Sequence, residues 1–494
     1  MTEIKIGLIE PPSLPLIDPE GKNWGRFKSD TGLGSWQILA GSLLSAGYQV
    51  DLINLKQGRE KIFIGETAWR NMRLEKIAWG TDWRTLDAKS RDVWGISVNF
   101  LVDREIVCKI IEYLSLNGGR VVVGGSDVFA EPEPYLQAGA CVVVMDKSGA
   151  SNQAAINVAL GKNPEGSYRL LTRDRKLSNS FSPLSPEEWP LPPVEIARQT
   201  LGKNASFGPT LSSPIGAAMF DQGCDRHCDF CETPLYRMRY QYMSVKRALE
   251  WISLQKRAGA KSFECWSDQF MGRILFPKTG RQEILDIMQG IRDLEIDVQW
   301  PNGLELSKAT LGRGKKDGDL APDEELINAL WGWDGKKGCT QSYLPAERPI
   351  EGRTAYAKLL PWQDHVRLVK AIVRAGIPSL SYGVIIGLPD DSQEKMMYLY
   401  EALFELRSAL LDINPNLALR VIPQSITAIP GTPLTARLKQ EGFLRYSDPA
   451  IVGNRTTPAC DTKYMSHGEV ADWQMKFWKN LIGIKGYHGT TAFE

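Results

Sequence analysis

The chain has 494 residues, enough for about three domains at roughly 150 residues each. Lysine and arginine total 59 and aspartate and glutamate total 58, so the formal net charge is +1. This balance excludes a polybasic protein that binds nucleic acid or a membrane surface by charge, and the hydrophobic content of 43% is that of an ordinary globular protein.

The first 162 residues alternate short apolar runs with segments of helical spacing. Strands are expected at 4–9, 48–55, 92–100, 120–125 and 141–146, and helices at 35–47, 103–119 and 131–139. This alternation predicts right-handed βαβ units and a parallel sheet. Ligands of such sheets bind at the carboxyl ends of the strands. Those ends are Pro11–Pro12, Ser97–Asn99, Gly124–Ser126 and Asp146–Ser148.

Residues 163–205 are rich in proline and polar residues, and this composition predicts a linker. The alternation then resumes from 206 to 445. Strands are expected at 214–220, 262–268, 297–306, 338–344, 379–391 and 418–426, with helices at 245–259, 284–296, 324–335, 365–377 and 395–410. Six strand–helix units predict a partial or complete βα barrel, whose chemistry lies on the loops after its strands. Residues 446–494 are expected to form a C-terminal cap.

Three of the eight cysteines crowd into the loop after the first barrel strand. Cys224, Cys228 and Cys231 form the pattern C-x3-C-x2-C. The N-terminus lacks the pattern of a signal peptide and no apolar run approaches 18 residues, so we expect a cytoplasmic protein with reduced thiols. Three thiolates at this spacing suit a [4Fe–4S] cluster with one open iron. The alternative is a structural zinc with a remote fourth ligand such as His227.

Phe230 completes the pattern C-x3-C-x-aromatic-C, which resembles the motif of the radical S-adenosylmethionine (radical SAM) superfamily. The resemblance implies that the three cysteines hold a [4Fe–4S] cluster whose open iron binds SAM, and that one electron then yields a 5′-deoxyadenosyl radical. Later segments resemble those of the family in the same order over 210–442, although GCTQSYLPAER at 338–348 departs from the usual G-x-E-S. The SAM contacts implied are Phe230, Asp268, Ser342, Glu347, Gly387 and Pro430.

The segment before the barrel resembles the cobalamin-binding domain that precedes many radical SAM cores. The contacts implied there are Pro12, Ser97, Asn99, Gly124, Gly125 and Ser126. The four histidines, at 227, 365, 467 and 488, all lie outside 1–162, so cobalamin is expected base-off with no histidine from this domain. The alternative is a degenerate domain whose strand ends are ordinary turns and which binds no cofactor.

These expectations define an α/β architecture. A Rossmann-like cobalamin-binding domain spans 1–162 and a linker spans 163–205. A partial TIM-type radical SAM barrel spans 206–445, and a small C-terminal cap spans 446–494.

The remaining cysteines and several aromatic residues have competing interpretations. Packing is favoured for Cys108, Cys141, Cys265 and Cys339, and a surface loop for Cys460; Cys265, Cys339, Tyr343, Tyr382, Trp266 and Trp300 lie on barrel strands, where a side chain either packs or meets substrate.

The resemblance implies an enzyme that methylates an unactivated carbon of a small metabolite or natural-product intermediate through the 5′-deoxyadenosyl radical and methylcobalamin. An electron donor such as flavodoxin or ferredoxin is expected, whereas nucleic acid is not expected as a partner. The second hypothesis is a cobalamin-binding radical SAM enzyme that catalyses ring contraction, cyclisation or oxidation without methyl transfer. The third is a metal-binding module without catalysis.

Overall fold

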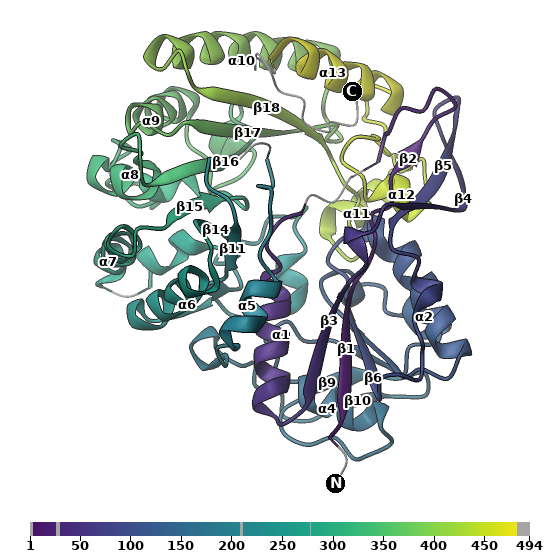
Figure 1. Cartoon of the computed structure of the whole chain (residues 1–494). Coiled ribbons are helices and arrows are strands. Elements are labelled where there is room, and N and C mark those ends of the chain that lie inside the picture. Colours follow the sequence, from purple (N-terminus) through teal and green to yellow (C-terminus); the bar gives the residue numbers. More distant parts are fainter. Residues whose placement is uncertain (1–2, 26–29, 208–210, 277, 482–494) are drawn as a thin grey trace.

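Two largely parallel sheets organise the chain, and Figure 1 shows the purple and blue N-terminal sheet beneath the teal and green barrel sheet. The computed structural model describes residues 3–25, 30–207, 211–276 and 278–481. The predicted C-terminal cap therefore lies within the described residues only as far as 481. No helix among these residues is both long and apolar enough to span a membrane.

The N-terminal sheet has the strand order β10-β9-β8-β7-β6-β1-β3. Its parallel strands are β1 (Lys5–Glu10), β3 (Gln49–Asn54), β6 (Val93–Ser97), β7 (Val121–Gly124) and β8 (Val142–Val144). Short, fully buried valine runs such as β7 and β8 are typical of a sheet covered on both faces. The helices α1 (Gly34–Ser45) and α4 (Asn152–Ala159) cover one face, and α2 (Arg104–Leu116) and α3 (Glu133–Gln137) cover the other.

Two hairpins in this half were not expected from the sequence. The strands β9 (Arg169–Leu171) and β10 (Lys176–Ser178) lie inside the predicted linker, yet they extend the N-terminal sheet with antiparallel pairing. A second hairpin, β4 (Glu60–Trp69) and β5 (Met72–Gly80), pairs with β2 (Leu16–Ile17) in a separate sheet. Its residues alternate between exposed and less exposed, which is the two-residue period of a strand.

The barrel sheet is parallel and follows the chain in the order β11-β14-β15-β16-β17-β18. Its strands are β11 (Ile215–Ala218), β14 (Ser262–Cys265), β15 (Asp297–Trp300), β16 (Cys339–Glu347), β17 (Ser379–Ile386) and β18 (Ala418–Ser425). The outer helices are α6 (Val245–Ala258), α7 (Gly280–Asp293), α8 (Glu324–Trp331), α9 (Trp362–Arg374) and α10 (Gln393–Ile413). This confirms the six predicted units. Within the described part of the chain β11 and β18 do not pair, so the barrel is partial.

The remaining elements connect the two halves. The short hairpin β12 (Asp221–Gln222) and β13 (Gln241–Tyr242) brackets the cysteines, and α5 (Val194–Gln199) contacts α6. The helices α11 (Pro433–Gln440), α12 (Pro449–Val452) and α13 (His467–Leu481) follow the last strand, and α13 packs on β18. A hydrophobic cluster joins Trp69 of the long hairpin to Ile451 and Cys460 of this C-terminal part.

Candidate functional site

The cysteine loop leaves the barrel directly after β11. Cys224, Cys228 and Cys231 are half-buried and form no disulfide. Gly223, at the start of the loop, has φ +78°, and a Cβ there would lie 2.8 Å from the carbonyl oxygen of Arg239. Only glycine suits this position, because L-residues rarely adopt that φ and a side chain would meet backbone. The turn therefore brings all three thiols onto one short loop.

The three thiols are the candidate donors for a metal centre. Among the described residues no group of three His, Cys, Asp or Glu side chains is already arranged around one point as for a single metal ion. In a cubane cluster each thiolate binds a different iron, so the thiolates need not share one point. Burial raises the pKa of the Cys224 thiol to about 11 and that of Cys228 to about 12. Binding iron must therefore release protons from these thiols.

Three ion pairs hold the start of the loop. The carboxylate of Glu305 accepts from Arg226 Nη2 at 2.6 Å and lies 3.0 Å from Lys308 Nζ. Lys308, which is fully buried, also reaches Asp225 Oδ1 at 2.6 Å. Burial acts to raise the pKa of Glu305, but Lys308 and Arg226 outweigh it and the pKa is lowered. The segment after β15 is thus fastened to the residues that follow Cys224.

The end of β14 supplies two polar side chains. Asp268 Oδ2 accepts from Gly223 N at 2.8 Å, and Gln269 Nε2 lies 3.7 Å from Cys224 Sγ. The Asp268 side chain is exposed, yet burial raises its pKa. Nearby, Trp266 Nε1 is buried and has no partner in the described part of the chain.

A third contact comes from the end of β16 and the segment after it. Phe230 meets the ring of Tyr356 edge-on at 5.2 Å, and Lys358 Nζ lies 5.8 Å from the Phe230 ring centre. Lys358 also donates to Glu347 Oε1 at 2.6 Å. Glu347 has φ +54°, a left-handed conformation that costs a residue with a side chain about 1–3 kcal/mol. Glu347 lies near enough to Cys228 for its negative charge to raise the pKa of that thiol.

The other residues implied for SAM are less uniform in position. The Ser342 hydroxyl accepts from Trp331 Nε1 at 3.0 Å, so it faces α8 and not the barrel interior. Gly387 N donates to Asp391 Oδ2 at 2.9 Å, in the turn after β17. Pro430 lies in the turn before α11, whose Leu434 N donates to the carbonyl of Asp229 in the cysteine loop. Of these three residues, only Pro430 belongs to a segment that contacts the cysteine loop.

The N-terminal domain meets the cysteine loop at its strand ends. Tyr236 OH lies 2.7 Å from Ser126 Oγ and 2.8 Å from Glu232 Oε1. Lys147 Nζ donates to Ser126 Oγ at 3.0 Å and to Asn99 Oδ1 at 3.2 Å. Hydroxyl, amide and ammonium groups therefore line the contact between the two domains, a donor set that suits a ligand rich in amide groups.

The remaining strand-end residues have local roles. Asn99 Nδ2 lies 3.5 Å from Ser97 Oγ, and a Cβ on Gly80 would lie 2.7 Å from Pro12 Cβ. Gly125 has φ +113° and a Cβ there would meet the carbonyl of Val98 at 2.1 Å. The close contact with Val98 therefore explains the glycine at this position without a bound ligand. At Gly124 a Cβ would make only ordinary contact with Val144 at 3.4 Å.

Tyr343 and Tyr382, both expected on barrel strands, have different surroundings in the structure. The Tyr382 hydroxyl pairs with His365 Nε2 at 2.6 Å in the helix layer. Tyr343 faces the barrel interior, where its ring stacks on Phe207 at 5.4 Å and a Cβ on Gly383 would lie 1.9 Å from its hydroxyl. Burial raises the pKa of Tyr343 to about 12.

The cysteines outside the loop and the other aromatic candidates pack. Cys265 and Cys339 are buried, as is Trp300, whose Nε1 donates to the carbonyl of Leu330. Cys460 is also buried, so the prediction of a surface loop there was wrong. Cys108 and Cys141 are half-buried. None of these five cysteines is hydrogen-bonded to the cysteine loop in the described structure.

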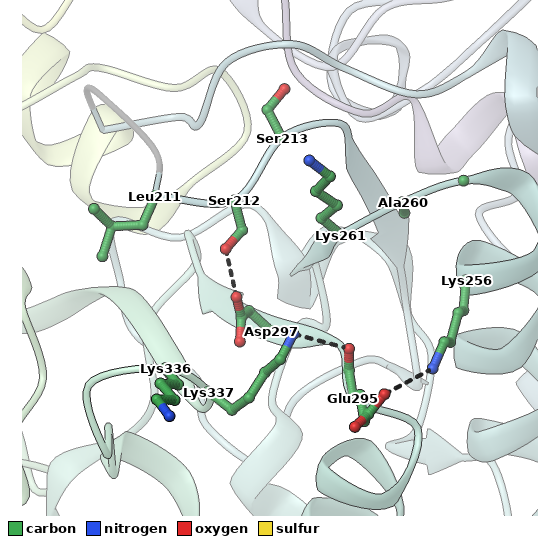
Figure 2. A pocket seen from close by; sticks show the side chains of 11 residues that line it. Leu211, Ser212, Ser213, Lys256, Ala260, Lys261, Glu295, Asp297, Lys336 and Lys337 are labelled. Atoms are coloured by element: carbon green, nitrogen blue, oxygen red, sulfur yellow. Dashed lines mark hydrogen bonds and ion pairs between the residues drawn. The ribbon is translucent and has the colours of Figure 1, made fainter.

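A surface cavity of about 430 Å³ lies at the opposite, amino-terminal end of the barrel strands. Figure 2 shows Lys256, Lys261, Lys336 and Lys337 around it, with Asp297 bonded to Ser212. The loops that carry chemistry in βα barrels follow the strands, so this cavity is separate from the cysteine site.

Several residues at the site carry no motif in the sequence. They are Lys147, Glu232, Tyr236, Gln269, Glu305, Lys308, Tyr356 and Lys358. Gln269 and Glu305 follow the barrel strands β14 and β15 closely, so the strand-end rule alone would have nominated them. Tyr236 and Lys358 give no such signal, because only the folded chain brings them to the cysteines or the N-terminal domain.

Among known proteins, solved structures match this chain. No family model and no curated protein matches the chain. The cobalamin-dependent SAM radical enzyme OxsB, with aqua-cobalamin and SAM bound, superposes with a TM-score of 0.68 and 15% identity over 96% of this chain and 67% of that one. The radical SAM methyltransferase TsrM from Kitasatospora setae, with tryptophan substrate and a SAM analog bound, superposes with a TM-score of 0.62 and 14% identity over 99% of this chain and 93% of that one.

A second TsrM structure, with cobalamin and a [4Fe–4S] cluster bound, superposes with a TM-score of 0.56 and 13% identity over 97% of this chain and 85% of that one. Each likeness spans both sheets, so the order of domains is shared as well as each fold. The chain therefore has the fold of the cobalamin-dependent radical SAM enzymes.

Proposed function

We propose that the protein is a cobalamin-dependent radical SAM enzyme that methylates an unactivated carbon of a small metabolite or natural-product intermediate. One observation carries the proposal: the three-cysteine loop of the barrel is hydrogen-bonded to the strand ends of a Rossmann-like domain. Tyr236 from the loop meets Ser126, and Gln222 Nε2 donates to the carbonyl of Lys147 at 2.6 Å. A metal centre and a ligand on the N-terminal sheet would thus face each other.

The residues fit the groups that this function needs. Cys224, Cys228 and Cys231 would hold a [4Fe–4S] cluster, and Asp268, Glu347 and the turn at Gly387 and Pro430 border the space where SAM would bind. Asn99, Ser126 and Lys147 would hold cobalamin base-off, since 1–162 contain no histidine. When bound, the cluster with SAM supplies a carbon-centred radical and cobalamin supplies a methyl group.

The chain itself would position the reacting groups and exclude water from them. The ion pairs of Glu305 with Arg226 and Lys308 hold the cysteine loop, while Lys358 keeps Glu347 oriented. Tyr343 and Phe207 close the barrel interior beneath the loop. A substrate bound above Tyr343 would lie between the two cofactors and away from bulk water, which protects a radical and aligns the reacting atoms.

The superposed structures support part of this proposal. TsrM is described as a methyltransferase and contains tryptophan as substrate, which favours a small molecule here. An external one-electron donor such as flavodoxin or ferredoxin would serve the cluster.

A second candidate function is radical chemistry with bound cobalamin but without methyl transfer, such as ring contraction, cyclisation or oxidation. It is favoured by the likeness to OxsB, a cobalamin-dependent SAM radical enzyme, which superposes with a higher TM-score than TsrM. The products separate the two, because only methylation makes S-adenosylhomocysteine and a substrate heavier by one methyl group.

The test is anaerobic reconstitution with iron, sulfide and hydroxocobalamin, followed by absorption spectra and assays for 5′-deoxyadenosine and S-adenosylhomocysteine. We expect Cys231→Ala to abolish both the cluster and 5′-deoxyadenosine, because the remaining two thiolates cannot hold the cubane. Cys141→Ala, also a half-buried cysteine but remote from the loop, is the control and should behave as wild type. Persistence of 5′-deoxyadenosine in Cys231→Ala contradicts the cluster assignment, and a wild-type protein without cobalamin contradicts the methylation proposal.

A further inference from the structure

We infer that Gln269 is a positioning residue for the metal centre: its side-chain amide donates a hydrogen bond to Cys224 and raises the reduction potential of the cluster. The inference rests on the proposed function, because it requires Cys224 to ligate a [4Fe–4S] cluster. Gln269 follows β14, 45 residues along the chain from Cys224, and belongs to no part of the cysteine motif.

The geometry fixes which way the amide faces. Gln269 Nε2 lies 3.7 Å from Cys224 Sγ and 2.9 Å from Glu305 Oε2. Both neighbours are acceptors, and the NH2 group has one hydrogen for each. The flipped amide would instead turn its oxygen toward the Glu305 carboxylate, which cannot donate while it is ionised. The side chain is 9% exposed, so water does not compete freely for these hydrogens.

Both ends of this contact are held in place. Gln269 N donates to Asp221 Oδ1 at 2.8 Å, which anchors the backbone. Glu305 is oriented by Arg226 at 2.6 Å, by Lys308 at 3.0 Å and by the Ser307 hydroxyl at 2.8 Å. The amide is therefore presented to the sulfur in one orientation before any cluster binds, and keeping it there costs little further entropy.

The three cysteines differ in what reaches them. Cys224 Sγ also accepts from Arg226 N at 3.4 Å, and Cys231 Sγ contacts Thr233 Oγ1 at 3.4 Å. Within the described residues Gln269 is the one side-chain N–H donor to a cysteine of the loop. Hydrogen bonds to cluster sulfurs stabilise the extra negative charge of the reduced state more than the oxidised state, and so raise the reduction potential. Removing this donor should lower the potential without removing a ligand.

The experiment is an EPR-monitored redox titration of the reconstituted full-length protein. Gln269→Met keeps the length of the side chain without a donor, and Gln269→Leu also removes the donor without adding charge. We expect both variants to hold wild-type amounts of iron and sulfide and to show more negative midpoint potentials. The matched control is Gln282→Met, because Gln282 Nε2 also donates to a carboxylate at 2.9 Å but lies exposed on α7.

The outcomes separate the two levels of the proposal. Potentials in the Gln269 variants that equal those of wild type and Gln282→Met overturn the inference and leave the proposed function intact. If Gln269→Met fails to fold, Gln269→Leu decides by the same comparison. A wild-type protein that binds no cluster under the same reconstitution refutes the proposed function, and this inference with it.

Discussion

At the scale of single residues, the barrel interior contains charged groups that an ordinary core would exclude. Glu264 on β14 is fully buried, and its Oε1 accepts from Ser206 N at 2.7 Å. Its Oε2 has no partner in the described part of the chain, and burial raises the pKa of the carboxyl to about 7. A buried carboxyl with one unpaired oxygen is more stable protonated than ionised.

This carboxyl should make stability depend on pH. The folded protein holds the Glu264 proton up to about pH 7, whereas the unfolded chain loses it near the ordinary glutamate value. The group's contribution to the free energy of unfolding is therefore complete at low pH and is lost as pH rises through about 7, with a slope of about 1.4 kcal/mol per pH unit. Urea denaturation at pH 5, 6, 7 and 8 should show wild type losing stability relative to Glu264→Gln as pH rises. A difference that stays constant with pH contradicts this, and the exposed substitution Glu195→Gln is the control.

At the scale of elements, α1 of the N-terminal domain docks on α6 of the barrel through a pair of buried glutamines. Gln255 Nε2 donates to Gln37 Oε1 at 2.8 Å, and Gln37 Nε2 donates to Gln255 Oε1 at 3.1 Å. Gln37 Nε2 also reaches Thr200 Oγ1 at 2.8 Å. Both glutamines are fully buried, so the reciprocal pair satisfies polar atoms that water does not reach.

A double-mutant cycle tests this docking. We expect Gln37→Met and Gln255→Met each to lower the free energy of unfolding by about 1–3 kcal/mol, because each removes a hydrogen bond from the buried amide that remains. The double variant should lose less than the sum, with a coupling of about 0.5–3 kcal/mol measured by denaturant unfolding. Strict additivity would show that the two amides act independently.

At the scale of the whole molecule, the hairpin β4–β5 ties the beginning of the chain to its end. Trp69 is 1% exposed, its Nε1 donates to the carbonyl of Pro458 at 3.0 Å, and its ring lies 5.2 Å from that of Trp24. The carbonyl of Trp24 in turn accepts from Asn454 Nδ2 at 2.6 Å. The same hydrophobic cluster reaches the half-buried Phe230, so this connection borders the cysteine loop.

Trp69→Ala should therefore loosen the connection between the hairpin and residues 449–460. The cavity and the lost contacts are expected to cost about 3–5 kcal/mol. Hydrogen exchange should become faster in the hairpin and in 449–460 together, while the N-terminal sheet keeps its protection. Trp69→Phe, which retains an aromatic ring, should lose less. Faster exchange confined to the hairpin would show that it does not hold the C-terminal part.

The fold was predictable wherever burial leaves a local pattern. The six barrel units and the parallel strands β1, β3, β6, β7 and β8 were expected, because their apolar residues repeat with helical or strand periodicity. The strands β9 and β10 were missed because a three-residue strand is too short to show a period and lies among prolines. The hairpin β4–β5 was missed because charged residues interrupt its alternation, and only its packing against the C-terminal part explains it.

The sequence by itself determined that Cys224, Cys228, Cys231 and Phe230 are neighbours in the chain, and their spacing alone predicts the centre of the candidate site. Only the tertiary structure decided what surrounds them. It placed Ser126 against Tyr236, Gln269 against Cys224 and Lys358 over Phe230, and it turned Ser342 away toward α8. These contacts join residues far apart along the chain. No local periodicity encodes them, because they arise only when the two sheets pack and the loops after their strands meet.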